Sequence, residues 1–218
     1  MRLDRVTAFL EETLDLDSFS GDSSMNGLQV EGAHDIRKVA LAVDACGESI
    51  ARAVRRGADM LIVHHGLFWG SAAPLTGIMA SRIKALLDGK VSLYAAHLPL
   101  DCHPEIGNNA QIADLLGLTE REKFGRYAGV DIGICGAPRR PLKLESLRRR
   151  LAGVLGSHVQ AFAFGPAVVE KVGIVSGGGA SLTQAAAEAG CDALLTGETS
   201  HSSYHVAREN RISLIFAG

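Results

Sequence analysis

The chain has 218 residues, of which 47% are apolar and only 5% aromatic, with 25 glycines and a formal net charge of −2. This composition disfavours an all-β fold and fits an alternating α/β protein, and the length allows one large or two small domains with a sizeable core. The near-neutral charge argues against nucleic acid as a partner, and no apolar run approaches the ~20 residues needed to cross a membrane.

Alternating helix and strand patterns fill the first half of the chain. Apolar residues at helical spacing predict an amphipathic helix over residues 3–14. Further along, strands are predicted at 39–43, 59–63 and 91–96, with helices at about 49–56 and 78–87 between them. This βαβαβ order predicts a parallel sheet.

The second half continues the alternation, with predicted helices at 109–116 and 144–155 and predicted strands at 130–135 and 158–164. From residue 171 onward the order is strand, glycine-rich turn, helix, strand, helix, strand, with the last two strands at 193–196 and 212–216. We expect two domains, residues 1–125 and residues 126–218.

The last segment repeats the first. At an offset of 133, Gly57 aligns with Gly190 and Asp59 with Asp192, and an offset of 121 aligns 91–97 with 212–218. Similar βαβ units can also resemble one another by chance. As a true repeat, the pattern predicts an α/β fold of two similar lobes packed around a shared cleft.

Metal-ligand side chains follow two of the predicted strands. His64 and His65 end the second strand, and His97 and Asp101 follow the third. Loops at the carboxyl ends of parallel strands carry the chemistry of open α/β sheets, and imidazole with carboxylate suits zinc, iron or manganese. A single histidine at a strand end is more often packed or solvated, but the four together predict a metal site. Because neighbouring side chains on a strand point to opposite sides, His64 and His65 are poorly placed to bind one ion together, which favours two ions.

Two features of the second half are ambiguous. The Ser176–Gly179 turn before a helix could bind phosphate, but it lacks the spacing of known phosphate loops and could equally be a tight turn. Glu198 occupies the position equivalent to His65, where it could transfer protons in the cleft or cap the next helix.

Other polar residues also admit two interpretations. His201 and His205 share one helix face, where they could bind metal or lie partly in solvent. Asn26 and Gln29 could line the cavity or stabilise a loop. The four cysteines form no C-x-x-C pair and are expected to be free thiols of a cytoplasmic protein, since the acidic N-terminal segment is no signal peptide.

Six motifs, in order, resemble those of the Nif-three-like family, whose members are often named GTP cyclohydrolase I type 2 homologues or dinuclear metal centre proteins. They are NGLQVEG (26–32), VHHGLFW (63–69), AHLPLD (96–101), GNNA (107–110), SGGG (176–179) and TGE (196–198). The resemblance implies the two-lobed Nif-three-like fold, a homohexamer built as a trimer of dimers, and two divalent ions per subunit. It also implies His64, His65 and Asp101 as ligands, with His97 close by.

The resemblance breaks at the end of the sequence. The family continues with a histidine and, four residues later, a glutamate that bridges both ions, whereas this sequence stops at Gly218. We therefore expect a truncated second lobe and incompletely bound metal.

The function implied is a dinuclear metal-dependent hydrolase that uses zinc, iron, manganese or magnesium. If the cyclohydrolase name applies, water attacks C8 of the guanine of GTP, formate leaves and the product rearranges to dihydroneopterin triphosphate, with His97 or Glu198 carrying protons. A small-molecule or nucleotide substrate is expected. The alternative is a non-enzymatic hexameric scaffold or metal-handling protein, because fold and metal do not fix a reaction.

Overall fold

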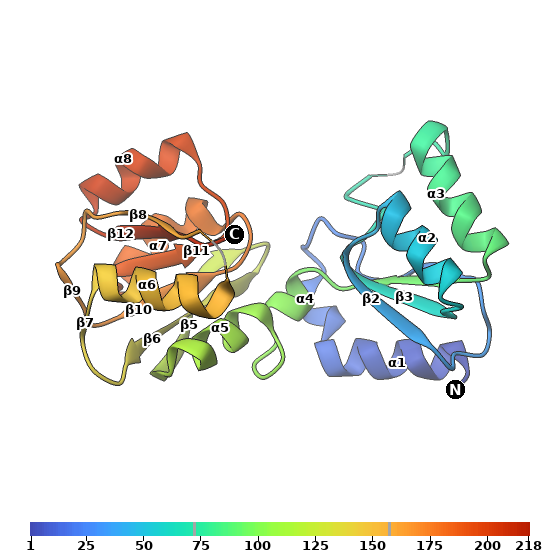
Figure 1. Ribbon diagram of the computed structural model, residues 1–218, viewed down its shortest axis with the longest axis horizontal. Coiled ribbons are helices and arrows are strands. Elements are labelled where there is room, and N and C mark those ends of the chain that lie inside the picture. The colour runs from blue at the N-terminus through green and yellow to red at the C-terminus, as the bar shows by residue number, and fades with distance from the viewer. Residues whose placement is uncertain (72, 157) are drawn as a thin grey trace. The chain divides into compact units, whose positions relative to one another are not determined.

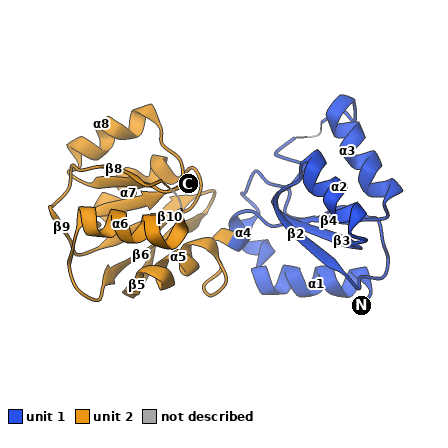
Figure 2. Cartoon of the chain, in the orientation of Figure 1, with its two compact units in different colours: residues 1–100 blue, residues 101–218 orange. Residues whose placement is uncertain are grey.

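The computed structural model describes residues 1–71, 73–156 and 158–218, and the chain divides into two compact units, Met1–Leu100 and Asp101–Gly218 (Figure 2). The boundary lies earlier than the expected one at 125/126. The reason is that β5 (Leu118–Tyr127) pairs with β6 (Val130–Pro138), so the residues before 126 already belong to the second sheet.

The first unit contains a four-stranded sheet with helices on both faces (Figure 1). Its helices are α1 (Leu3–Leu14), the 3-10 helix η1 (Leu16–Phe19), α2 (Gly47–Arg55) and α3 (Gly77–Asp88), and its strands are β1 (Gly27–Val30), β2 (Val39–Asp44), β3 (Met60–His65) and β4 (Ser92–Ala95). A short helix, α4 (Leu98–Asp101), reaches the boundary. The strand order is β1-β4-β3-β2; β2, β3 and β4 are parallel, as predicted, and β1 is antiparallel to β4.

Alternation along the strands gives this sheet two apolar faces. Helix α1 covers one face, where Leu14 packs with Met60 and Tyr94. Helices α2 and α3 cover the other, where Ile50 and Leu86 belong to a cluster with the inward-facing residues of β3 and β4. The two helical layers hold the carboxyl ends of β3 and β4 in a fixed position.

The second unit is built around a six-stranded sheet of order β5-β6-β10-β11-β12-β8, in which β10, β11 and β12 are parallel. Its remaining strands are β7 (Leu142–Lys143), β8 (Gln160–Phe162), β9 (Val168–Val169), β10 (Val172–Val175), β11 (Ala193–Thr196) and β12 (Ser213–Phe216). Its helices are α5 (Asn108–Leu116), α6 (Leu144–Leu155), the 3-10 helix η2 (Gly179–Leu182), α7 (Thr183–Glu188) and α8 (His201–Glu209). Helices α5 and α6 pack on one face of the sheet, and α7 and α8 on the other.

The two units repeat the same hydrogen bonds at the predicted offsets. Asp59 Oδ2 accepts the two backbone N–H groups before β2 at 2.9 and 2.8 Å, and Asp192 Oδ2 accepts the two before β10 at 2.7 and 3.0 Å. Gly32 and Gly165 each donate their N–H, at 3.0 Å, to the serine that opens the last parallel strand. The antiparallel strand beside that last strand, β1 in one unit and β8 in the other, also recurs at the offset of 133. The two-lobed α/β fold is therefore confirmed, whereas the shared cleft stays a prediction.

Among the helices of the described residues, none has the length and apolar character required to span a bilayer.

Candidate metal centre

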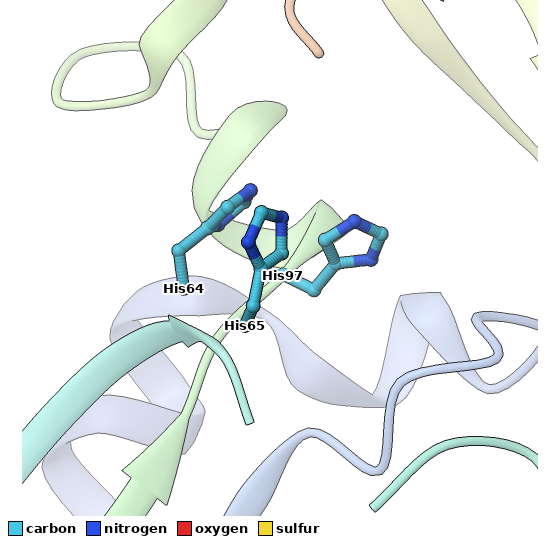
Figure 3. Close-up of side chains that lie close together, drawn as sticks. All are labelled: His64, His65 and His97. Atoms are coloured by element: carbon cyan, nitrogen blue, oxygen red, sulfur yellow. The ribbon is translucent and has the colours of Figure 1, made fainter. Parts of the chain in front are cut away.

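Three histidines from the first unit gather at the carboxyl edge of its sheet (Figure 3). His64 and His65 are the last two residues of β3, and His97 lies between β4 and α4. Their ring centroids are 4.5 Å apart for His64 and His65, 5.0 Å for His64 and His97, and 5.7 Å for His65 and His97. One ring nitrogen of each histidine lies within 4.8 Å of those of the other two, a spacing that could hold a metal ion.

The two adjacent histidines do not diverge as the alternation of strand side chains suggested. Strand β3 still pairs with β2 at His65, yet the ring centroids of His64 and His65 are only 4.5 Å apart. Opposite Cβ directions therefore do not separate their ring nitrogens, which lie within 4.8 Å of each other. The alternation of side chains along β3 therefore no longer argues for two ions, and only the family resemblance implies the second ion.

His64 and His65 are each oriented through Nδ1. His64 Nδ1 lies 3.0 Å from the carbonyl oxygen of Ala96, and His65 Nδ1 lies 2.8 Å from Asp44 Oδ1. Asp44 is the last residue of β2, the parallel strand next to β3, so it reaches the same sheet edge as His65. Both partners are oxygens that can only accept, which places the ring proton on Nδ1.

His97 is held by a buried carboxylate. The Asp22 side chain is 1% exposed, and both of its oxygens lie 3.0 Å from His97 Nδ1. It also accepts hydrogen bonds from Asn26 Nδ2 at 2.9 Å and from the backbone N–H groups of Ser24 and Leu98 at 3.1 and 3.2 Å. Burial raises the pKa of Asp22, but the hydrogen bonds from His97, Asn26 and Ser24 outweigh it and hold this pKa below its ordinary value.

All three rings thus share one arrangement: Nδ1 faces an oxygen that accepts its proton, which leaves Nε2 as the nitrogen available to a metal ion. A carboxylate or carbonyl at the outer nitrogen is the usual support of a metal-binding histidine, because it fixes both tautomer and ring orientation. The residues present therefore fit a divalent transition metal.

Two amides hold the loops that carry the histidines. Asn26 Oδ1 accepts the backbone N–H of His97 at 2.7 Å. Gln29 accepts the N–H of Leu67 at 2.7 Å and donates to the carbonyl of Met25 at 2.7 Å, which ties the loop after β3 to the loop before β1. Both Asn26 and Gln29 therefore stabilise loops, which is one of the two interpretations given above. Asn26 also lines a pocket.

An aromatic ring flanks the histidines. Trp69 lies 5.0 Å from the ring of His97 in an edge-on arrangement and 6.0 Å from that of His65. Its Nε1 donates to the carbonyl of Gly66 at 3.1 Å, which fixes the indole in place.

Asp101 and Glu198 belong to the second unit, and their predicted site roles stay predictions. Asp101 is the last residue of α4, is 7% exposed and accepts a hydrogen bond from Asn108 Nδ2 at 2.6 Å. Glu198 is exposed in the loop after β11, and its backbone N–H donates to the carbonyl of Gly177 at 2.9 Å.

The other ambiguous segments have defined surroundings within the second unit. The Ser176–Gly179 turn is bonded to the last residue of β11, since Thr196 Oγ1 accepts the Gly179 N–H and donates to the Gly177 carbonyl, each at 2.9 Å. This favours the tight-turn interpretation. His201 and His205 on α8 have ring centroids 6.1 Å apart.

Sequence reasoning missed two residues of the site, Asp22 and Asp44. Asp44 could have been found, because it directly follows a predicted parallel strand next to the His64–His65 strand. Asp22 lies in a polar loop 75 residues before His97, and no sequence pattern links the two.

Comparisons with known proteins identify the family. Residues 1–218 match the sequence profile of Duf34/NIF3 (NGG1p interacting factor 3). A protein of Pyrococcus abyssi named GTP cyclohydrolase 1 type 2 homolog is 44% identical over 219 residues, which cover 100% of this chain and 87% of the relative. The solved structures of protein ybgI, described as of unknown function, and of TTHA1606 from Thermus thermophilus superpose with TM-scores of 0.91 and 0.89. Both are 38% identical, and the matches cover 100% of this chain and 87% and 86% of theirs. The chain therefore belongs to the Duf34/NIF3 family.

Proposed function

We propose that this protein is a metal-dependent hydrolase whose centre lies at His64, His65 and His97. One observation carries the proposal: three ring nitrogens lie within 4.8 Å of one another, and each ring is oriented by an acceptor at Nδ1. Their shared orientation is that of ligands.

We assign metal binding and proton transfer to different residues of the chain. His64 and His65 hold the metal, and the resemblance adds Asp101 as a further ligand and a second divalent ion. When bound, a divalent ion acts as a Lewis acid that polarises a substrate oxygen and makes water more acidic. His97, backed by the Asp22 carboxylate, is placed either to hold metal or to carry a proton, and Glu198 is the second candidate proton carrier.

GTP is the first substrate to test, since relatives at 40–44% identity carry the name GTP cyclohydrolase 1 type 2 homolog. The experiment measures metal content by mass spectrometry and formate release from GTP for the wild type and for His65→Ala and His97→Gln, with His158→Ala as the control. We expect His65→Ala to lose metal and turnover together. Loss of metal in His97→Gln marks a ligand, whereas retained metal with lost turnover marks a proton carrier.

The same assay addresses the non-enzymatic scaffold. A chain that binds metal at these histidines but hydrolyses neither GTP nor other nucleotides supports the scaffold and contradicts the hydrolase. Wild-type metal content in His65→Ala contradicts the metal site itself.

Self-association is also proposed, as the homohexamer that the family resemblance implies. Strand β2 is an edge strand, and Val39, Leu41 and Val43 on one of its faces are 44, 78 and 62% exposed in the single chain. Exposed apolar edges of this kind commonly pair with another chain. Light scattering tests the proposal, and a mass of one chain at high concentration contradicts it.

A further inference from the structure

An exposed indole ring lies beside the candidate metal centre. Trp69 is the single tryptophan of the chain and is 39% exposed, whereas tryptophan side chains in folded proteins are mostly well buried. Its ring centroid lies 5.0 Å from that of His97 and 6.0 Å from that of His65. A large apolar side chain is thus partly open to solvent next to two of the three histidines in Figure 3.

Although it is exposed, the indole is held in one position. Its Nε1 donates to the carbonyl of Gly66 at 3.1 Å. Its backbone forms an antiparallel bridge with Ser24, and in the same pairing the Met25 N–H donates to the carbonyl of Phe68 at 3.1 Å. A side chain that is already fixed loses little conformational entropy when a ligand packs against it.

The orientation of the neighbouring rings leaves indole surface available for stacking. Trp69 and His97 meet at an interplanar angle of 73°, so the imidazole occupies at most one of the two indole faces. The His65 ring is tilted by 47° at 6.0 Å and is therefore not stacked on the indole. Planar heteroaromatic rings stack on exposed aromatic faces, and every nucleobase has a face that can do so.

We propose that Trp69 stacks against a planar heteroaromatic ring of the substrate, such as a nucleobase, and thereby determines the substrate class of the proposed hydrolase. A ring stacked on the indole lies beside His65 and His97, because their centroids are only 6.0 and 5.0 Å from it. The same stacking discriminates against sugar phosphates that carry no base. The inference rests on the proposed function in calling the ligand a substrate, whereas the stacking itself needs no metal.

The single tryptophan reports the stacking directly, because a base that stacks on an indole quenches its fluorescence. The test titrates the full chain, treated with chelator, with guanosine, and ribose 5-phosphate is the comparison without a base. Free N-acetyltryptophanamide corrects for absorbed light and for random collisions. We expect saturable quenching with guanosine alone. Acrylamide, a small neutral quencher, should reach the indole of the free chain and should reach it less once guanosine is bound.

Variants locate the binding. Trp69→Leu should bind guanosine about tenfold more weakly in equilibrium dialysis, as expected for the loss of one stacking partner. Trp69→Phe keeps an aromatic face and should bind with an affinity between those of Trp69→Leu and the wild type. The control Tyr127→Leu removes an aromatic side chain of the second unit that is 48% exposed, and it should bind as the wild type does.

Metal content and kinetics separate stacking from a structural role. The metal content of Trp69→Leu should equal that of the wild type, because the indole Nε1–H is a donor and offers no ligand atom. Its KM for GTP should rise about tenfold with little change in kcat, since the stack is made equally in the ground state and the transition state. A residue that only supports the fold would lower metal content and kcat together.

Three outcomes overturn the inference. They are equal quenching by guanosine and ribose 5-phosphate, equal weakening in Trp69→Leu and Tyr127→Leu, and an indole that acrylamide cannot reach in the free chain because a second copy covers it. Each differs from failure of the proposed function. Guanosine stacking without metal or turnover retains the role of Trp69 and rejects the hydrolase, whereas metal and turnover without quenching reject the role of Trp69 alone.

Discussion

Replacing Asp22 with asparagine tests how the structure supports His97. The buried carboxylate accepts hydrogen bonds from four donors. Its Oδ1 accepts the Ser24 N–H, and its Oδ2 accepts Asn26 Nδ2 and the Leu98 N–H. Both oxygens lie within hydrogen-bond distance of His97 Nδ1. An amide nitrogen cannot accept a hydrogen bond. In the Asp22→Asn variant, the better of the two amide orientations therefore leaves the Ser24 N–H unpaired.

That single unpaired donor predicts a loss of about 1–3 kcal/mol of unfolding free energy, measured by urea denaturation. Removing the carboxylate that orients His97 predicts a metal affinity about 10 to 100 times weaker, measured by competition with a chelating dye. Asp44→Asn is the matched control. The Asp44 side chain is 63% exposed and bonds His65 at 2.8 Å, so this variant should weaken metal binding with little change in stability. Equal loss of stability in both variants, or unchanged metal affinity in Asp22→Asn, would refute the reasoning.

Three further predictions concern the fold and the site. Gly32→Ala and Gly165→Ala should each lower the free energy of unfolding by about 1–3 kcal/mol or more. The reason is that an added Cβ would lie 2.5 Å from backbone atoms, which cannot move aside. Urea midpoints equal to that of the wild type would contradict this prediction. Hydrogen bonds from the backbone N–H groups of Arg37 and Lys38 hold the pKa of Asp59 in the folded protein below its ordinary 3.8. The ionised Asp59 therefore stabilises the fold fully above pH 3.8, and this stabilisation is lost as the pH falls through the lower pKa of the folded state. Asp59→Asn should therefore lower stability at neutral pH but not in strong acid, and a deficit that persists in acid would count against it. Trp69, the single tryptophan, should change its fluorescence when zinc is added, and unchanged emission while dialysis shows bound zinc would contradict its position beside His97.

Much of the fold follows from local patterns in the sequence. Apolar spacing predicted α1, the three parallel strands of each lobe and the helices between them, because a 3.6-residue period and short buried apolar runs reflect local geometry. The repeat at offsets of 133 and 121 was also visible, since Asp59 and Asp192 perform the same backbone-capping task. Four of the described strands escaped prediction. Strands β7 and β9 have two residues each, and β1 has four. Strand β5 is an edge strand whose segment TEREK at 119–123 shows no alternation of apolar and polar residues.

For the site, the sequence determined which histidines end the strands, and the tertiary structure decided how they are held. Topology alone predicted that loops after β3 and β4 meet, because parallel neighbours end at the same edge. Whether two adjacent imidazoles diverge or converge depends on the side-chain rotamers and on the oxygens of Ala96 and Asp44 that orient the rings, which only the folded sheet brings into place. The buried carboxylate behind His97 comes from a loop 75 residues away, where the Asp22 N–H donates to the carbonyl of Phe19, the last residue of η1, at 2.9 Å. Contacts of this kind depend on the three-dimensional path of the chain, which leaves no periodic pattern in the sequence.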